Sequence, residues 1–346
     1  MATSRFHPRR IQLLLAAVAL TAIPLALLAL LGPNSEGPAT DQWPTVPPIA
    51  ATDPEKVELA RKAEPITVVA AGDIACDPQN PAFNGGRGTS DHCAQHRTAN
   101  LIERIDPDAV FALGDLQYDD GSLADFRAVY DRSWGRFYDI TYPIVGNHEY
   151  GSGDPQGYFD YFDRRPIGDA GEGWYSFRIG HWEVYALNAN CSYPYFQAPS
   201  CERGSEQWVW LRDSLRQSRA VCQLAMWHEP RVSSGPHGSY PRLEPLWRLV
   251  DEAGVELVLS GHDHLYERFA PIGRGGRPDP DGVRQFIVGV GGGELYAVAD
   301  PQPGSEVRVD DRFGVLELEL DEARFAWTYR AIEPDRELDS GMEDCT

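Results

Sequence analysis

ITVVAAGD, residues 66–73, is an apolar run that stops at a glycine and an aspartate. Two later runs, AVFALGD at 109–115 and YPIVGN at 142–147, have the same form. Continuous apolar runs of this length, separated by amphipathic stretches, are typical of strands that are buried on both faces of a sheet. The repeated pattern predicts an α/β fold in which a polar residue follows the carboxyl end of each strand.

The rest of the chain continues this alternation. Residues 174–188, WYSFRIGHWEVYALN, alternate between apolar and polar side chains and turn at Gly180-His181, which predicts an antiparallel hairpin. Helical spacing of apolar residues predicts helices at 206–215 and 245–253. Further strands are predicted at 222–226, 255–259, 285–290, 313–320 and 325–329, and the last of these is the final predicted strand.

Five short polar clusters follow the predicted strands. They are Gly72-Asp73, Gly114-Asp115-Leu116-Gln117-Tyr118, Gly146-Asn147-His148-Glu149, Trp227-His228-Glu229 and Gly261-His262-Asp263-His264. Taken singly, such a residue is more often a turn former, a helix cap or a structural histidine. Together they supply the oxygen and imidazole donors that a two-metal hydrolytic centre needs from several elements at once.

The series resembles the calcineurin-like metallophosphoesterases, and within them the purple acid phosphatase branch, over residues 65–332. The resemblance implies a four-layer αββα sandwich, in which two mixed β-sheets are flanked by helices and two metal ions lie at the carboxyl ends of the strands. The second cluster discriminates between branches, because its Gly-Asp-x-x-Tyr pattern is similar to the motif whose tyrosine binds ferric iron in purple acid phosphatases.

The first cluster departs from that branch. It continues as Asp73-Ile74-Ala75, where purple acid phosphatases have Asp-x-Gly and the diesterase and nuclease branches have Asp-x-His with a histidine ligand. Alanine cannot coordinate a metal, so the first ion lacks a donor unless Tyr118 supplies it. The absence of a ligand at Ala75 and the presence of Tyr118 in the second cluster therefore support each other.

The resemblance implies a ligand set for each metal ion. The first ion is expected to be held by Asp73, Asp115, Tyr118 and His264. The second is expected to be held by Asp115, Asn147, His228 and His262. Phenolate and carboxylate donors favour Fe(III) at the Tyr118 site, whereas the second site, richer in imidazole, suits Zn, Mn or Fe(II).

Two further histidines are candidate catalytic residues. His148 matches an outer-sphere histidine of the family that contacts the phosphate. His237, nine residues after His228, resembles a second outer-sphere histidine of the family, which protonates the leaving alcohol. An equally weighted alternative is that His237 is a solvated loop residue without a catalytic role. The expected reaction is attack on phosphorus by a metal-bound hydroxide.

The net charge of −21 argues against a nucleic-acid partner, because such partners are attracted by clustered Lys and Arg. The function that the resemblance implies is that of an exported dinuclear-metal phosphomonoesterase acting on a small phosphorylated substrate. A phosphodiesterase on the same scaffold is the first alternative, and a non-catalytic surface binding protein is the second. The oligomeric state is left open.

The amino terminus has a membrane-targeting pattern. Arg5, Arg9 and Arg10 precede an apolar run at 11–31, which predicts a signal peptide or a retained membrane anchor at 1–32. A Pro-rich linker at 33–64, a catalytic domain at 65–332 and a tail at 333–346 are expected to follow. The protein is thus expected outside the cell or in the cell envelope.

The six cysteines, an even number in a chain expected to be exported, favour disulfides over thiolate metal sites. Short separations predict the pairs Cys76–Cys93 and Cys191–Cys201, which leaves Cys222 for Cys345 near the carboxyl terminus.

Overall fold

The structure is a computed structural model that describes residues 65–151, 153–169, 171–193, 196–332 and 335–346. The segments 1–32 and 33–64, predicted as a signal peptide or anchor and a linker, lie outside the described residues. Among the described helices, none is both long enough and apolar enough to span a bilayer.

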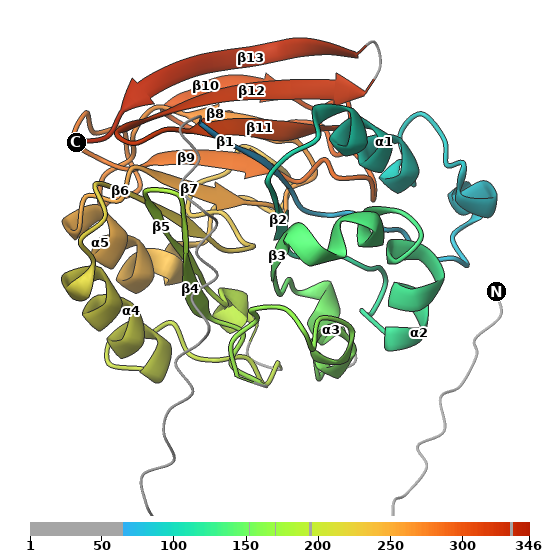
Figure 1. Cartoon of the computed structure of the whole chain (residues 1–346), viewed down its shortest axis with the longest axis horizontal. Helices are drawn as coiled ribbons and strands as arrows, with labels where there is room; N and C mark the ends of the chain where they lie inside the picture. Colours follow the sequence, from blue (N-terminus) through green and yellow to red (C-terminus); the bar gives the residue numbers. More distant parts are fainter. Residues whose placement is uncertain (1–64, 152, 170, 194–195, 333–334) are drawn as a thin grey trace, which may run out of the picture. The chain divides into compact units, whose positions relative to one another are not determined.

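Two mixed β-sheets form the centre of the described chain (Figure 1). The first has the strand order β13-β12-β11-β1-β2-β3, and the second has the order β10-β8-β9-β7-β6-β5-β4. The first sheet contains β1 (Ile66–Ala71), β2 (Ala109–Leu113), β3 (Thr141–Ile144), β11 (Gly314–Leu320), β12 (Arg324–Ile332) and β13 (Asp335–Asp344). The second contains β4 (Tyr175–Ile179), β5 (Trp182–Ala186), β6 (Cys222–Met226), β7 (Leu257–Ser260), β8 (Tyr266–Phe269), β9 (Arg284–Val288) and β10 (Ser305–Val309).

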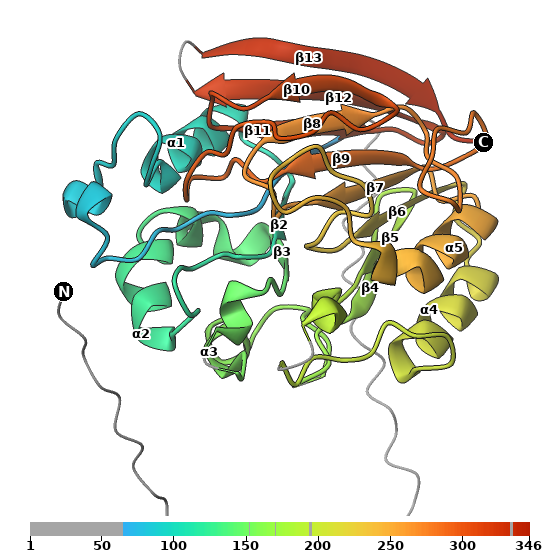
Figure 2. The ribbon, with the colours of Figure 1, turned by 180° about the vertical axis from the view of Figure 1, so that it is seen from behind.

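Helices flank the sheets on both sides, as the views from the front and from behind show (Figures 1 and 2). Beside the first sheet lie α1 (Gln95–Ile105), α2 (Leu123–Asp125) and α3 (Gln156–Tyr161), and beside the second lie α4 (Glu206–Gln217) and α5 (Glu244–Glu252). Short 3₁₀ or π turns occupy Pro81–Gly86, Phe126–Tyr130, Trp134–Ile140, His148–Tyr150, Asn190–Ser192 and Pro241–Leu243.

The buried side chains explain this layering. One core cluster contains Phe111 of the first sheet together with Leu224 of the second, so the two sheets pack face to face. A second cluster joins Val258 of the second sheet to Leu211 of α4 and Trp247 of α5. Because β2 is buried along its whole length, its sequence is a continuous apolar run, whereas β3 and β7, which are equally buried, each contain one small hydroxyl residue, Thr141 and Ser260. The predicted four-layer αββα sandwich is confirmed.

The expectation that residues 325–329 form the last strand was wrong. Residues 335–344, within the segment expected to be a tail, form β13 and pair antiparallel with β12. Their sequence, DRELDSGMED, lacks apolar alternation because β13 lies at the edge of its sheet. Hydrogen bonds of Arg268 to Asp339 and of Arg284 to Glu343 attach this strand instead.

The three predicted disulfides, Cys76–Cys93, Cys191–Cys201 and Cys222–Cys345, are confirmed. The last of them joins β6 of the second sheet to the residue that follows β13 of the first. It therefore links the two sheets covalently.

Candidate metal centre

The predicted ligands follow the carboxyl ends of five strands from both sheets. Asp73, Asp115 and Asn147 come after the parallel strands β1, β2 and β3. His228 comes after β6, and His262 after its parallel neighbour β7. Since parallel strands bring their carboxyl ends to the same edge of a sheet, the order of the strands alone gathers these side chains.

The glycines that precede these ligands make a close approach possible. A Cβ atom on Gly146 would lie 2.2 Å from Asp115 Oδ1, and one on Gly114 would lie 2.6 Å from His228 Nδ1. Gly114 also has a φ of +82°, which favours glycine. Gly114 and Gly146 are therefore explained by the packing of one strand end against another.

Three of the predicted ligands have an uncommon backbone conformation. The φ angles of Asp73, Asp115 and His262 are 59°, 49° and 73°. Left-handed conformations of this kind cost roughly 1 kcal/mol in residues other than glycine, and they concentrate at functional sites.

The Tyr118 group, defined as Asp73, Tyr118 and His264, is closely packed. The hydroxyl of Tyr118 lies 3.0 Å from Asp73 Oδ1 and 2.9 Å from His264 Nε2, and this nitrogen lies 3.2 Å from the same carboxylate oxygen. Burial, followed by the charges of Asp73 and Asp115, raises the pKa of Tyr118 well above its usual value. The phenol therefore keeps its proton unless a strongly charged cation replaces it.

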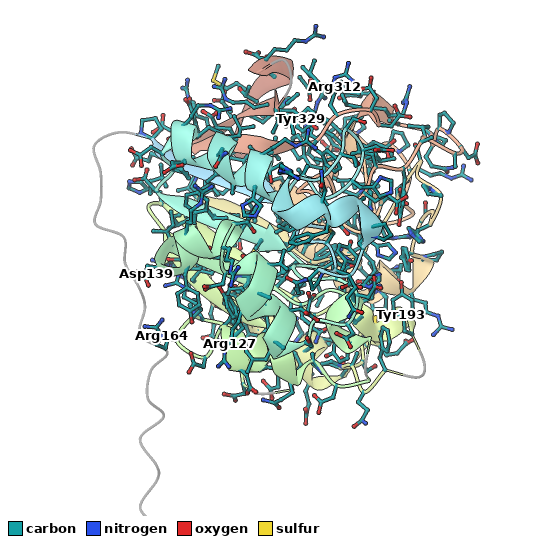
Figure 3. All side chains as sticks on the ribbon, turned by 90° about the vertical axis from the view of Figure 1, so that its right-hand side faces the viewer. Arg127, Asp139, Arg164, Tyr193, Arg312 and Tyr329 are labelled. Carbon is teal, nitrogen blue, oxygen red and sulfur yellow. A yellow bond between two sulfur atoms is a disulfide. The ribbon has the colours of Figure 1, made fainter. Side chains whose placement is uncertain are left out.

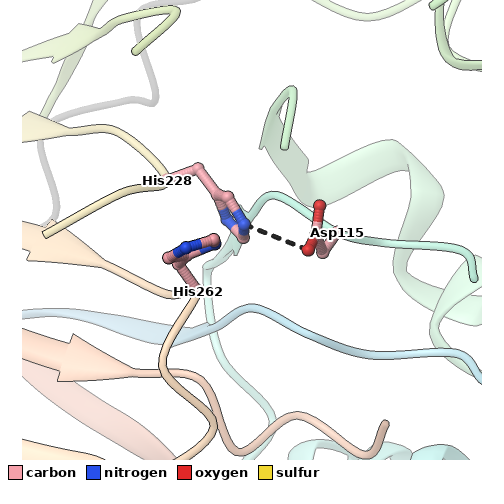
Figure 4. A group of neighbouring side chains, drawn as sticks. All are labelled: Asp115, His228 and His262. Carbon is pink, nitrogen blue, oxygen red and sulfur yellow. Dashed lines mark ion pairs between the residues drawn. The ribbon is translucent and has the colours of Figure 1, made fainter. Parts of the chain in front are cut away.

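The His228 group, defined as Asn147, His228 and His262, contains the other predicted ligands besides Asp115. Donor atoms of Asp115, His228 and His262 all lie within 4.8 Å of one another, and all three side chains are buried (Figure 4). His228 donates its Nδ1–H to the carbonyl oxygen of Leu113 at 2.7 Å, which leaves the Nε2 lone pair 3.1 Å from Asp115 Oδ2. A backbone partner of this kind fixes the tautomer of a metal-binding histidine.

Asp115 connects the two groups. Its Oδ2 lies 3.1 Å from His228 Nε2 and 3.5 Å from the hydroxyl of Tyr118, while its Oδ1 accepts a hydrogen bond from the backbone N–H of His148 at 2.8 Å. Burial alone would raise the pKa of Asp115, but the charges of His228 and His148 outweigh it and lower that pKa well below its usual range.

Two observations show that this donor set fits cations. The Nε2 lone pair of His228 and the carboxylate of Asp115 repel each other at 3.1 Å unless a proton or a cation lies between them. Accordingly, although burial lowers the pKa of His228, the charge of Asp115 raises it well above the usual value. The Oδ1 of Asn147 is also buried, and within the described chain it accepts no hydrogen bond.

The two candidate catalytic histidines flank the centre. His148 Nδ1 lies 2.6 Å from the carbonyl oxygen of Asp119, and Nε2 lies 4.0 Å from Asp115 Oδ2. Burial lowers the pKa of His148, but the charge of Asp115 and the hydrogen bond with Asp119 raise it above its usual value. The structure brings His237 to the other side, where its exposed ring lies 4.6 Å from the ring of His262, measured between centroids.

Several residues without a role in the sequence analysis hold this site in place. The carboxylate of Glu149 accepts hydrogen bonds from the backbone N–H groups of Gly146, Asp115, Leu116 and Gln117. Asp263 accepts hydrogen bonds from the backbone N–H of His237 and from the hydroxyl of Ser233. Glu149 and Asp263 both belong to the polar clusters that follow the predicted strands, and this position in the sequence could have identified them as part of the site.

Tyr240 has no such signal in the sequence. Its hydroxyl lies 2.6 Å from His262 Nε2 and 3.2 Å from the hydroxyl of Tyr193. When His262 donates from Nε2, the lone pair of Nδ1 is left for a metal ion. Burial, followed by the charge of His228, lowers the pKa of His262 well below its usual value, so the imidazole is neutral as a ligand must be.

Two cavities differ in their relation to this centre. A cavity of about 540 Å³ is lined by Arg127, Asp139 and Arg164 among others, and these three lie together in Figure 3. No predicted ligand lines it. A smaller cavity of about 130 Å³ is lined by Tyr118, His148 and His264 and therefore adjoins the centre.

Carboxylate and imidazole donors that converge in this way are typical of hydrolases that use two metal ions. The profile of the calcineurin-like phosphoesterase family matches residues 65–266, and the chain belongs to that family. It is a metallophosphoesterase with a buried group of Asp and His side chains suited to metal binding.

Relatives with known names are distant. The chain is 26% identical to purple acid phosphatase 18 of Arabidopsis thaliana over 298 residues, which cover 78% of this chain and 61% of that protein. It is 24% identical to purple acid phosphatase 17 of the same plant, over 61% of this chain and 67% of that protein. The fold is similar to that of purple acid phosphatase PPD1 from yellow lupin, with a TM-score of 0.67, 20% identity, and coverage of 82% of this chain and 54% of that one.

Proposed function

We propose that this protein is an exported phosphomonoesterase of the purple acid phosphatase type. The observation that carries the proposal is the position of Tyr118, whose hydroxyl lies 3.0 Å from Asp73 Oδ1 and 2.9 Å from His264 Nε2. A tyrosine thus stands among the donors of the first site, where Ala75 provides none. The names of the similar plant proteins support the same assignment.

We assign Asp73, Asp115, Tyr118 and His264 to Fe(III), and Asp115, Asn147, His228 and His262 to Zn, Mn or Fe(II). The chemistry that two such cations supply when bound is Lewis-acid activation of water and stabilisation of the charge on the phosphoryl oxygens. Asp115 offsets part of the positive charge of both. The hydrogen bonds that Glu149 accepts keep the backbone around Asp115 in place.

His148 and His237 handle the substrate and its protons. Because Nδ1 of His148 faces the carbonyl oxygen of Asp119, Nε2 is the nitrogen that faces the centre and donates to a phosphoryl oxygen. His237 gives a proton to the alcohol that leaves, and Asp263 orients its loop by accepting from the backbone N–H of His237. These two roles place a proton donor on each side of the phosphate.

The proposed location is outside the cytoplasm, where disulfides form and persist. Three disulfides in the described chain and the basic, then apolar, amino terminus support it. Anchoring in the membrane through residues 11–31 remains part of this proposal. The substrate is a small phosphorylated molecule rather than a nucleic acid, because the net charge is −21.

The test is a metal analysis of the purified protein together with its visible spectrum and its turnover of a phosphomonoester and of bis(p-nitrophenyl) phosphate. We expect iron plus a second metal, a purple tyrosinate band and faster hydrolysis of the monoester. A colourless protein that holds only zinc or manganese would overturn the assignment of Tyr118. Faster hydrolysis of the diester would identify a phosphodiesterase, and metal-free protein without any hydrolysis would leave a binding role.

A further inference from the structure

Tyr296, which lies between β9 and β10, contacts two histidines that have different proposed roles. Its ring stacks on the ring of His264, with centroids 4.0 Å apart and an angle of 4° between the planes. The same ring lies 5.5 Å from the ring of His237, measured between centroids, at an angle of 58°. One side chain therefore touches both a ligand assigned to iron and the histidine assigned to the leaving alcohol.

The three imidazoles among the predicted ligands are held in different ways. His228 donates from Nδ1 to a backbone carbonyl oxygen at 2.7 Å, and His262 Nε2 lies 2.6 Å from the hydroxyl of Tyr240. The buried Nδ1 of His264 makes no hydrogen bond within the described chain. A metal-binding histidine usually has a partner on its second nitrogen that fixes the orientation of the ring. For His264, the stacked ring of Tyr296 takes the place of that partner.

The backbone keeps Tyr296 in position for this contact. Its N–H donates to the carbonyl oxygen of His264 at 2.9 Å, and its side chain is half-buried. Stacked aromatic rings attract each other beyond what burial alone supplies. The ring of Tyr296 therefore favours the orientation of His264 in which Nε2 lies 2.9 Å from the hydroxyl of Tyr118.

The segment that follows Tyr296 also holds the loop that carries His237. The backbone N–H groups of Ala299 and Asp300 donate to the carbonyl oxygen of Ser234 at 2.8 and 3.1 Å. Ser234 is buried and belongs to the same loop as His237, whose ring is exposed. The ring of Tyr296 thus limits the movement of the exposed imidazole, while the backbone of the same segment fixes the loop beneath it.

We propose that Tyr296 is a positioning residue whose flat ring fixes the orientation of His264 and keeps His237 beside the metal centre. The hydroxyl of Tyr296 is not required, because the ring makes both contacts. The inference rests on the proposed function and adds a residue that links the iron site to the proton donor. Loss of the ring should therefore change two separate properties, iron binding and protonation of the leaving group.

The first test compares Tyr296→Leu, which removes the ring, with Tyr296→Phe, which keeps it. For Tyr296→Leu we expect iron to bind about 10-fold less tightly and the tyrosinate band to shift, with the second metal retained. Tyr296→Phe should retain the iron affinity and the band. Tyr138→Leu is the matched control, because Tyr138 is half-buried, stacks on Phe162 and lines the larger cavity, which no predicted ligand lines. It should lower stability without changing iron binding.

The second test varies the leaving group. p-Nitrophenolate departs without a proton, whereas the alkoxide released from glycerol 2-phosphate needs one, which His237 is proposed to give. General-acid catalysis contributes about 10²- to 10⁴-fold, and a displaced histidine loses part of this. We therefore expect Tyr296→Leu to lower kcat/KM for glycerol 2-phosphate roughly 10-fold more than for p-nitrophenyl phosphate. A merely structural defect would lower both values alike, and Tyr296→Phe should keep the original ratio.

Tyr296→Met, which fills more of the space without a flat ring, replaces Tyr296→Leu if circular dichroism shows that the leucine variant does not fold. An unchanged iron affinity or an unchanged substrate ratio in the variant without the ring would overturn the inference. Equal losses in Tyr296→Phe would also overturn it, because the hydroxyl rather than the ring would then be responsible. These outcomes leave the proposed function intact. If the unmodified protein held no iron or hydrolysed no phosphomonoester, the proposed function would fail instead.

Discussion

The Tyr118 group and the His228 group hold their donors in different ways. In the Tyr118 group the donors contact one another, with the hydroxyl of Tyr118 between Asp73 and His264 at 3.0 and 2.9 Å. In the His228 group a backbone carbonyl fixes His228, and the Oδ1 of Asn147 has no partner within the described chain. The first group must lose the phenol proton to bind a cation. In the second group His262 is already neutral, and a cation must displace only the proton that the charge of Asp115 favours on His228.

This difference predicts different metal preferences. Removal of the phenol proton against a raised pKa requires a highly charged ion such as Fe(III). The imidazole of His262 is neutral, and an imidazolium such as that of His228 gives up its proton more readily than a phenol does, so we expect the second group to accept an ordinary divalent ion. Under the proposed assignment, the two groups would distinguish two ions although both share Asp115.

The largest effect is expected from Asp115→Asn, because it removes the residue that both groups share. We expect kcat/KM for p-nitrophenyl phosphate to fall by roughly 10³-fold or more, and both metals to bind less tightly. Activity assays and metal analysis measure these effects, and Asp160→Asn serves as the exposed control. If only one metal were lost, Asp115 would belong to one group and the comparison would fail.

The pair Tyr118→Phe and His228→Ala separates the two groups. We expect Tyr118→Phe to abolish the visible band and to weaken iron binding by at least about 10²-fold, with the second metal retained. His228→Ala should instead weaken binding of the second metal and retain iron and the visible band, because its side chain belongs to the other group. Metal stoichiometry and the spectrum distinguish the variants, and identical losses in both would show that the two sites do not act separately.

Much of the fold was predictable from the sequence. Strands that are buried on both faces, such as β2, must be continuous apolar runs, and the polar residue after each run identified the strand ends. β13 was not predictable, because its exposed edge position requires no apolar pattern and its attachment depends on distant arginines, Arg268 and Arg284. Its disulfide at Cys345 was the one signal that the carboxyl-terminal segment returns to the domain.

The site was predictable to a similar degree. Asp73, Asp115 and His228 lie together because motif order and strand order agree. Tyr240 was missed because its contact with His262 depends on how a loop after β6 folds back, which no local pattern encodes.

Gly114→Ala tests whether the backbone determines the position of His228. The added methyl would lie 2.6 Å from His228 Nδ1 and 3.0 Å from the Cα of Gly146. We expect a loss of about 3 kcal/mol in the free energy of unfolding, from steric overlap and from the positive φ together. Gly254→Ala is the matched control, because its φ is +69° with nothing within 4 Å, and it should lose only about 1 kcal/mol. If urea denaturation gave the same loss of unfolding free energy for both variants, the contact with His228 would not contribute to the destabilisation.

The protonation of His148 is expected to determine how kcat/KM depends on pH. Because the pKa of His148 is raised above 6.5, its imidazole stays cationic to a higher pH than a free histidine and loses its proton only above that value. We expect kcat/KM to fall as pH rises through this pKa, and His148→Gln to lower activity roughly 30-fold at acidic pH while removing that alkaline limb. An unchanged limb in the variant would assign the titration to another group.

The smallest effect is expected from Tyr240→Phe, which removes only the hydroxyl that contacts His262 Nε2 at 2.6 Å. Loss of an outer partner of a metal-binding histidine weakens metal affinity by about 10-fold or somewhat more, so we expect the second metal alone to bind about 10-fold less tightly. Tyr329→Phe is the matched control, because Tyr329 is buried and donates to the carbonyl oxygen of Arg312 in a region remote from Tyr193 (Figure 3). It should lower stability without changing either metal affinity. If Tyr240→Phe instead weakened iron binding at the Tyr118 group, the orientation of His262 would matter to both sites, and the two groups would form one coupled unit.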